Sequence, residues 1–262
     1  MLISPATARA QLDRDRYHNL MLLGALDFEN VRSAYSLERD DDLAAVALIV
    51  DQHGPLPEVW PTIMVVASDA EALAQLVLHE DWPAPATWST RQRDLLPVLE
   101  ECLGQQHDPA RGVLYYLYPA GTPPHQPHRL VRRLTAGDAD MLDLEPCSLS
   151  TTAMRNWLRR GWHIFGAVER GQLLSHALAA YPIGDTEEVA AVYTAPQARG
   201  RGLASAVVAA TAADIVSRGL RAVYATTRAN VASQQVATSV GLKPLFETWD
   251  IPTLNSGAAG KR

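Results

Sequence analysis

The sequence predicts an α/β protein built from two similar halves, and three observations lead to this expectation. Segments with the apolar period of helices alternate with short segments rich in Val, Ala, Ile and Tyr, which are typical of strands. The segment Pro119–His128 divides the 262 residues almost equally, because four prolines and one glycine in ten residues neither continue a helix nor fill a central strand. On both sides of this break the expected elements follow in a similar order, as in a tandem repeat.

The first half is expected to form one domain, residues 1–118, with a linker at residues 119–128. Like the second half, it is expected to follow the order helix, three strands, helix, strand or extended segment, helix and strand. We expect helices over Tyr17–Leu26, Asp69–His79 and Thr90–Gln105, and strands over Val31–Leu37, Leu43–Asp51, Thr62–Ala67 and Val113–Tyr118.

The second half is expected to form a domain over residues 129–252, with a flexible tail at residues 253–262. Apolar residues recur at helical spacing from Gly202 to Arg218, Gly219 then ends that helix, and Asn230 can cap the next one. We expect helices over Ala136–Leu144, Gly202–Arg218 and Asn230–Val240, and strands over Leu130–Leu134, His163–Glu169, Leu173–Pro182, Glu188–Thr194, Ala222–Thr227 and Lys243–Ile251.

Composition excludes several classes of protein. With 47% hydrophobic residues the chain can bury a core, and 23 Lys+Arg against 29 Asp+Glu argue against a protein that coats nucleic acid. No apolar run reaches the roughly 18 residues of a membrane span, and the N-terminus lacks the apolar core of a signal peptide. Cys102 and Cys147 form no disulfide framework. We therefore expect a cytoplasmic protein without nucleic-acid or membrane partners and without a bound metal.

The segment Val189–Ala204 carries the clearest chemistry. It combines a strand, a turn with Pro196, a loop rich in Gly and Arg, and a helix start. The first turn of a helix has unpaired N–H groups and a partial positive charge, which together favour phosphate. Gly200 and Gly202 allow the backbone to approach a ligand, and Arg199 and Arg201 add fixed positive charge. The segment thus predicts an anion site.

Two common phosphate motifs fit this loop poorly. The Walker pattern needs a Lys after its second glycine, and none follows Gly200 or Gly202. The dinucleotide pattern fits better, since Gly200 and Gly202 are followed by Ser205, and Arg228 could hold a 2′-phosphate. However, the turn of the dinucleotide pattern should follow its strand directly, whereas Ala195–Arg199 lie between the strand and Gly200 here. That pattern should also begin a long series of βα units, but only about sixty residues follow Gly202.

The loop resembles the coenzyme A loop of the GNAT superfamily of N-acetyltransferases. The family signature, Gln/Arg-x-x-Gly-x-Gly/Ala, is present as Gln197-Ala-Arg-Gly200-Arg-Gly202, followed by Leu203 and Ala204. Downstream, Asn230-x-x-Ser233-x-x-Val236-Ala237-x-x-x-Gly241-Leu242 is similar to the second motif of the family, and the resemblance spans about residues 130–251.

The resemblance implies a GNAT acyltransferase fold and gives roles to individual residues. It implies that backbone groups of Val192 and Thr194 pair with the pantetheine amides, with Tyr193 facing the other side. It places the pyrophosphate on N–H groups from Arg199 to Ala204, and Asn230 and Ser233 at the pantetheine end. The implied activity is transfer of an acetyl or short acyl group from acetyl-CoA to the primary amine of a small molecule or peptide, without an acyl-enzyme.

An amine must lose a proton before it attacks, so a carboxylate is expected in the cleft. Glu188 is the first choice for this base and Glu187 the second. Alternation places Glu188 on the same face as Ala190 and Val192. The usual Tyr of the second motif, which protonates the leaving thiolate, is Ala237 here. Tyr193 or His176 could replace it by position, or no acid is needed.

The first half lacks the anion loop. Ser68, Asp69, Ala70 and Glu71 stand at the corresponding place, and Asp69 and Glu71 would cap a helix but repel a pyrophosphate. We therefore expect a degenerate GNAT-like half that packs against the active half, as in tandem members resembling the glycine N-acyltransferases.

The alternatives to an acyltransferase are a catalytically silent CoA-binding or regulatory module, or a purely structural protein. A homodimer and a monomeric pseudo-dimer both remain open.

Overall fold

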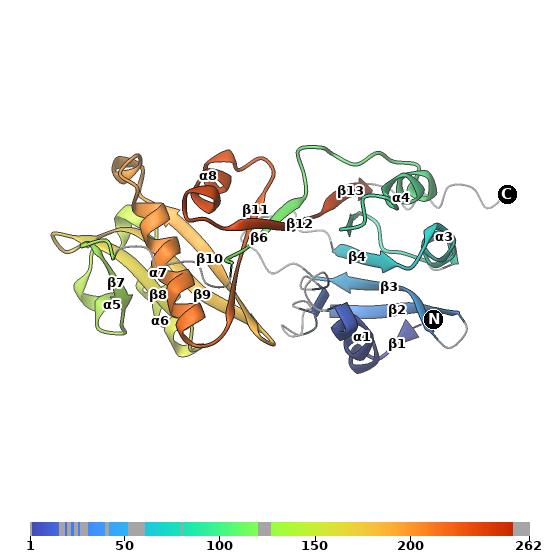
Figure 1. The fold of residues 1–262 in the computed structure, drawn as a ribbon, viewed down its shortest axis with the longest axis horizontal. Coiled ribbons are helices and arrows are strands. Elements are labelled where there is room, and N and C mark those ends of the chain that lie inside the picture. The colour runs from blue at the N-terminus through green and yellow to red at the C-terminus, as the bar shows by residue number, and fades with distance from the viewer. Residues whose placement is uncertain are drawn as a thin grey trace. The chain divides into compact units, whose positions relative to one another are not determined.

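The computed structural model of the chain describes residues 2–15, 19, 22–23, 26, 31–39, 42–51, 61–79, 81–119 and 127–253. These residues form an α/β protein of two compact units (Figure 1). Unit 1 takes in the chain up to Val113, Thr227–Ala229 and the chain from Phe246; unit 2 comprises Leu114–Thr226 and Asn230–Leu245. Most of the helix expected over Tyr17–Leu26, most of the Pro119–His128 break and nearly all of the tail lie outside the described residues.

Unit 1 contains a six-stranded sheet in the order β1-β2-β3-β4-β5-β13. The first four strands are antiparallel neighbours, and β4 and β5 are parallel with a helix between them in the chain. Its elements are β1 (Leu2–Ile3), α1 (Pro5–Leu12), β2 (Val31–Arg39), β3 (Asp42–Val50), β4 (Thr62–Ala67), α3 (Ala70–His79), β5 (Ala86–Thr90), α4 (Leu96–Leu103) and β13 (Trp249–Thr253).

Unit 2 contains a seven-stranded sheet in the order β12-β6-β11-β10-β9-β8-β7. Strands β7 to β10 are antiparallel neighbours, and β10 and β11 are parallel with a helix between them. Its elements are β6 (Val113–Leu117), β7 (Val131–Leu134), α5 (Asp138–Met141), α6 (Thr151–Arg159), β8 (His163–Glu169), β9 (Gln172–Ile183), β10 (Thr186–Thr194), α7 (Leu203–Ser217), β11 (Arg221–Thr227), α8 (Val231–Ser239) and β12 (Lys243–Glu247).

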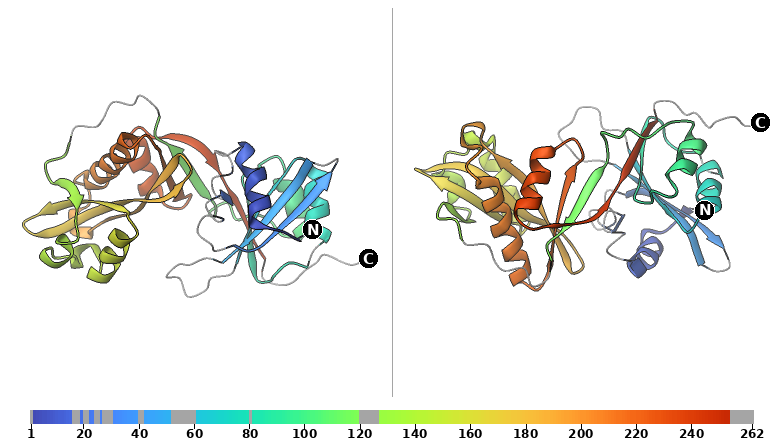
Figure 2. Two further views of the ribbon diagram at one scale, coloured as in Figure 1. Left: turned by 90° about the horizontal axis from the view of Figure 1, so that it is seen from below. Right: turned by 45° about the horizontal axis from the view of Figure 1, so that its top comes forward.

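Helices cover both faces of the sheet in unit 2. Figure 2 shows α7 and α8 on one face and α5 and α6 on the other. The α7 face is closed by Val207, Val208 and Ile215, which are all fully buried. The α6 face is closed by Met154, which is also fully buried, and by the half-buried Trp157. These two faces carry different side chains of β10, which decides where the site residues point.

The last strand of each half completes the sheet of the other unit. Strand β6, which ends the first half of the sequence, lies between β11 and β12, while β13 pairs with β5 (Figure 1). The strand expected over Lys243–Ile251 is therefore two strands in two sheets, separated at Thr248. For the same reason the compact units differ from a simple division of the chain at residues 118 and 129.

Several further elements differ from the sequence expectation. Neither β1 nor α1 was expected, and β5 takes the place of the strand or extended segment expected between the helices Asp69–His79 and Thr90–Gln105. The helix expected over Thr90–Gln105 begins only at Leu96, because Thr90 belongs to β5 and pairs with Trp249. The sequence pattern indicated a helical segment starting at Ala136 but did not predict α6 as a separate helix. Ser150 caps it, since the Ser150 hydroxyl accepts a hydrogen bond from the N–H of Ala153 at 3.1 Å.

Candidate functional site

Strands β10 and β11 part in the middle of the sheet. Their parallel pairing runs from Thr186 opposite Arg221 to Val189 opposite Tyr224 and then stops, although β10 continues to Thr194 alongside β9. The backbone N–H and C=O groups along an unpaired strand edge are strong hydrogen-bond donors and acceptors, and another extended chain can pair with them. The part of β10 after Val189 therefore offers its β11 side to an extended ligand.

A bulge in β10 changes which of its side chains share a face. Ala190 lies opposite Leu178 and Tyr193 lies opposite His176, so three residues of β10 face two of β9. Ala191 takes the extra position with φ 47°. The expectation that Val192 shares the face of Glu188 is therefore wrong: after the bulge, Tyr193 lies on that face, which is the face covered by α6.

The loop before α7 is built as an open cradle. Gly200 and Gly202 have φ of 76° and 73°, values that L side chains rarely adopt, and a Cβ added at either would meet no atom within 4 Å. Gly202 is the N-cap of α7 and, as a glycine, provides no side-chain cap for the first N–H groups of the helix. The backbone from Gly200 to Ala204 is thus open on the side where an anion could approach the helix terminus.

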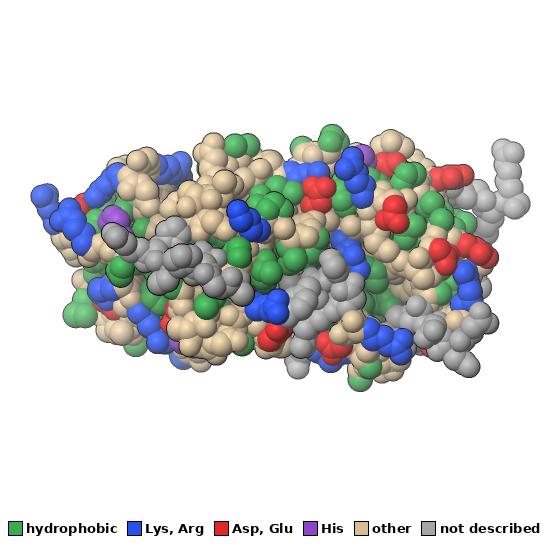
Figure 3. Space-filling view, viewed as in Figure 1, with side chains coloured by type: hydrophobic (Ala, Val, Ile, Leu, Met, Phe, Trp, Pro, Cys, Tyr) green, Lys and Arg blue, Asp and Glu red, His purple; other side chains and the backbone are tan. Residues whose placement is uncertain are grey.

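The two arginines of this loop are already engaged. Arg201 forms an ion pair with Glu169 at 3.0 Å, and Nε of Arg199 donates to the carbonyl of Thr194 at 3.3 Å. Both side chains are exposed, and Figure 3 shows basic side chains gathered over this loop and the β8–β9 turn. Gln197 is exposed next to them, and Leu203 is buried in the core.

The second motif forms the start of α8. The side chain of Asn230 accepts a hydrogen bond from the N–H of Ser233 at 3.1 Å, so the expected cap is confirmed. The hydroxyl of Ser233 hydrogen-bonds the hydroxyl of Tyr224. One turn later, Ala237 is fully buried and leaves no phenol at this place.

Glu188 lies on the α6 face of β10, just before the strands part. It is half-buried, and burial raises the pKa of its carboxyl group from 4.5 to about 7. Burial and then the negative charge of Glu188 also raise the pKa of Tyr181. A carboxyl group with a pKa near neutrality, next to a ligand-binding cleft, suits a general base.

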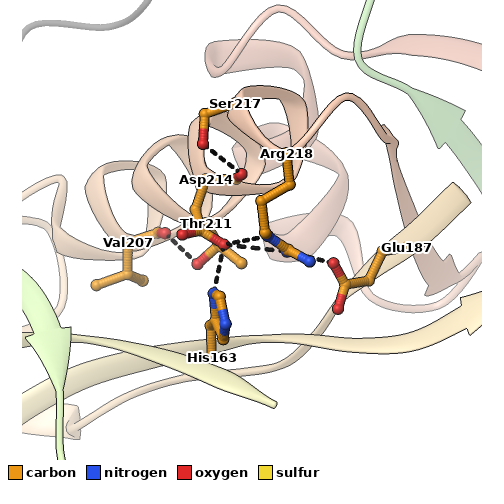
Figure 4. A network of polar contacts seen from close by, with 7 residues as sticks. All are labelled: His163, Glu187, Val207, Thr211, Asp214, Ser217 and Arg218. Atoms are coloured by element: carbon orange, nitrogen blue, oxygen red, sulfur yellow. Dashed lines mark hydrogen bonds and ion pairs between the residues drawn. The ribbon is translucent and has the colours of Figure 1, made fainter. Parts of the chain in front are cut away.

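Glu187 points to the opposite face of the sheet. Figure 4 shows it bound to Arg218, the C-cap residue of α7. Arg218 also contacts Asp214 at 3.0 Å, and Asp214 in turn contacts Nδ1 of His163 at 2.7 Å. Glu187 is 5% exposed and is held by a cation within this network. The structure therefore separates the two neighbouring carboxylates, with Glu188 directed to the α6 face and Glu187 directed to α7.

His176 is a poor source of a proton at neutral pH. It is 4% exposed, and burial lowers its pKa from 6.5 to about 4, so the imidazole is neutral. Its ring lies 5.9 Å from that of Trp157 and 6.2 Å from that of Tyr193, measured between centroids. Of the two positions considered for an acid, only Tyr193 keeps a suitable group.

The corresponding places of unit 1 are filled by its own side chains. Oδ1 of Asp69 accepts a hydrogen bond from the N–H of Ala72 at 2.8 Å, so Asp69 caps α3 as expected. Beyond the β4–β5 pairing, the side-chain amide of Gln92 binds both backbone groups of Ala67, at 2.7 Å and 2.6 Å. Gln92 thus takes the strand edge that stays open in unit 2.

Sequence reasoning missed Trp157 on the α6 face and the two tyrosines whose pKa is raised by burial and by the charge of Glu188, Tyr181 and Tyr224. Trp157 comes from a helix that the pattern did not separate, and Tyr181 occupies a positive-φ position, 55°, at a second irregularity of the β9–β10 ladder. Tyr224 could have been found, because it stands in the strand that follows the anion loop. Within the described ranges no helix is long and apolar enough to span a bilayer, and no group of three or more His, Cys, Asp or Glu side chains could hold a metal ion.

Comparisons with known proteins bear on both the segment and the fold. The FR47-like protein family matches residues 165–249, which include β10, the anion loop and α8. No curated protein matches the chain.

Solved structures match nearly the whole chain. A Drosophila protein aligns with a TM-score of 0.63 at 14% identity, covering 97% of this chain and 98% of that one. A GCN5-related N-acetyltransferase from Sphaerobacter thermophilus aligns with a TM-score of 0.63 at 14% identity, covering 95% and 93%. A tandem GNAT protein from the clavulanic acid biosynthesis pathway aligns with a TM-score of 0.52 at 11% identity, covering 100% and 99%. The chain therefore has the α/β fold of the GNAT acetyltransferases in tandem form, which confirms the resemblance that its two motifs indicated.

Proposed function

We propose that the chain transfers an acetyl or short acyl group from acetyl-CoA to a primary amine of a small molecule or peptide. The observation that carries this proposal is the open edge of β10, followed through a short loop by the N-terminus of α7, whose N-cap is Gly202. An extended chain of amides that ends in a pyrophosphate matches this order of backbone edge and helix terminus. Unit 2 is the catalytic unit in this proposal.

Acetyl-CoA would be held mainly by backbone groups. Backbone groups of Val192 and Thr194 in β10 would pair with the pantetheine. The carbonyl of Thr194 already accepts a hydrogen bond from Nε of Arg199, so this bond would be shared with the pantetheine or broken when it binds. The N–H groups from Arg199 to Ala204 would receive the pyrophosphate. Gly200 and Gly202 are required here because a side chain at either position would enter the open space in front of the loop.

Glu188 would act as the general base. A primary ammonium group passes one proton to the carboxylate, directly or through water. The nitrogen then forms a bond to the thioester carbonyl carbon, the carbon–sulfur bond breaks, and CoA leaves as a thiolate. The second proton of the nitrogen neutralises that thiolate, through Tyr193 or without an intermediary. A base with a pKa of about 7 is matched to this step at neutral pH.

A silent CoA-binding module is the second candidate function. The observation that favours it is the fully buried Ala237 at the place of the usual phenol. Acyl transfer to a panel of amines, measured as release of the CoA thiol, separates the two functions. Transfer that falls about 100-fold or more in Glu188→Gln supports the enzyme. Tight acetyl-CoA binding without turnover on a broad panel supports the silent module.

Calorimetric titration with acetyl-CoA tests the binding site itself. We expect micromolar binding by the native protein and none by a folded Gly202→Asp variant, because the aspartate adds bulk and negative charge at the pyrophosphate position. Gly219→Asp is the matched control, since Gly219 has φ 79° and open space around it but lies at the other end of α7. NADPH binding in place of acetyl-CoA would contradict the proposal and favour a dinucleotide site.

A further inference from the structure

Three aromatic side chains form a cluster on the α6 face of unit 2, on the face that carries Glu188. Trp157 of α6 and Tyr193 of β10 are half-buried, and His176 of β9 lies between them, with centroid distances of 5.9 Å and 6.2 Å to their rings. We call Trp157, His176 and Tyr193 the aromatic cluster. None of the three is accounted for by the binding of acetyl-CoA through backbone groups.

The imidazole of His176 lacks a partner that its burial calls for. Its Nδ1 atom is buried and has no hydrogen-bond partner within the part of the chain that the structure describes. A buried polar atom without a partner costs free energy, and such atoms are rare enough in folded proteins to require an explanation. A group on a bound ligand would provide the missing hydrogen bond.

The surroundings of the cluster select an uncharged group. On this face, His176 lies between Leu174 and Leu178 of β9, with Met154 of α6 packed into the same core. The low pKa of His176 agrees with surroundings that disfavour charge. Two aromatic rings and aliphatic neighbours favour a flat apolar group through ring contacts and burial.

The cluster lies within reach of the reacting amine. Glu188 is opposite Ala180, and His176 is four residues farther along β9, which is about 13 Å of strand. The bulge of β10, where the thioester would lie, falls between these two levels. An amine placed level with Leu178, where the bulge begins, would therefore have Glu188 and the aromatic cluster on opposite sides, each about 6–7 Å away along the strand.

We propose that the aromatic cluster is the acceptor subsite of the enzyme and takes a primary amine that carries an aromatic ring with a hydrogen-bonding substituent. The ring packs against Trp157 and Tyr193, and its polar substituent bonds Nδ1 of His176. This inference rests on the proposed acyl transfer for its meaning, but it concerns a binding site whose occupancy can be measured without turnover.

Two probes that differ by one hydroxyl group test the subsite. Tyramine and phenethylamine are titrated by calorimetry into the full-length protein, alone and saturated with CoA. We expect both amines to bind, and tyramine to bind about 3–10-fold more tightly because it can bond Nδ1. Trp157→Ala should weaken both amines about tenfold or more. His176→Phe keeps a ring and should remove only the preference for tyramine.

The matched control is His163→Phe. It makes the same exchange on the neighbouring strand β8, but His163 points to the opposite face and contacts Asp214. This variant should bind both amines as the native protein does. Thermal unfolding of each variant establishes that it is folded, and a destabilised Trp157→Ala would be replaced by Trp157→Leu.

Failure of this inference and failure of the proposed function give different results. Absence of amine binding at millimolar concentration, or equal loss of both amines in His176→Phe and His163→Phe, would overturn the acceptor subsite. Acetyl-CoA binding in the same preparations would still support the proposed cofactor site. Conversely, amine binding with the expected preferences but without acetyl-CoA binding would retain the subsite and reject the acyl transfer.

Discussion

Glu188 should destabilise the fold at neutral and alkaline pH, and Glu188→Gln should relieve this cost. Burial raises the pKa of its carboxyl group from 4.5 to about 7. A shift of this size corresponds to about 3 kcal/mol of differential stability between the protonated and ionised forms. Because the folded pKa is the higher one, the cost is absent below pH 4.5, grows as the pH rises to about 7, and then stays constant.

Urea unfolding of the native protein and Glu188→Gln between pH 4 and pH 8.5 measures this effect. We expect the variant to gain up to about 3 kcal/mol relative to the native protein across that range, with most of the change between pH 5 and pH 7. Glu187→Gln is the matched control. It should lose stability, since Glu187 is the buried partner of Arg218. A Glu188→Gln difference that does not vary with pH would refute the reasoning that burial holds this carboxyl group near neutrality.

Three further predictions concern the fold. Cutting the chain between β6 and β7 should give two fragments that each lack the strand completing their sheet. Each fragment alone should not unfold cooperatively, whereas the co-expressed pair should. A lone fragment that is stable would contradict the strand exchange. Gly112→Ala should lower the free energy of unfolding in urea by about 3 kcal/mol, because Gly112 has φ +98° and an added Cβ would lie 2.2 Å from the carbonyl oxygen of Thr248. Gly104→Ala, where an added Cβ would meet open space, should lower it by about 1 kcal/mol. Asp138→Asn should lower the free energy of unfolding by about 1–2 kcal/mol at pH 7, because Arg132 and Thr135 hold the pKa of Asp138 at about 2. In urea unfolding, this difference from the native protein should vanish as the pH falls from 3.8 to 2.

The local signals of the loop before α7 were readable from the sequence. Glycine at positions 200 and 202, followed by an apolar helical period and then Asn230, fixes turn, helix and cap by short-range chemistry. The absence of such a loop in the first half was also visible, because Asp69 is a strong N-cap and occupies the helix terminus that an anion would need. These features depend on residues close together in the chain.

The features that were not predicted depend on residues far apart or on one-residue irregularities. Nothing local distinguishes the strand Lys243–Ile251 from one that changes sheets at Thr248, since the partners of β13 are set by β5, about 160 residues earlier. The bulge at Ala191 is equally hidden, because Ala is unremarkable in a strand, yet it turns Tyr193 rather than Val192 towards the face of Glu188. The closure of unit 1 by Gln92 likewise requires the tertiary structure.

Hydrogen exchange of the backbone amides with and without acetyl-CoA tests the central claim most directly. In the proposed complex, the pantetheine lies along the part of β10 that β11 leaves unpaired, and the pyrophosphate lies on the first turn of α7. We expect acetyl-CoA to slow exchange in peptides covering residues 190–204, and to leave residues 66–73 of unit 1 unchanged, where Gln92 and Asp69 already occupy the strand edge and the helix start. Equal protection of both units, or protection confined to unit 1, would contradict the assignment of unit 2 as the acetyl-CoA site.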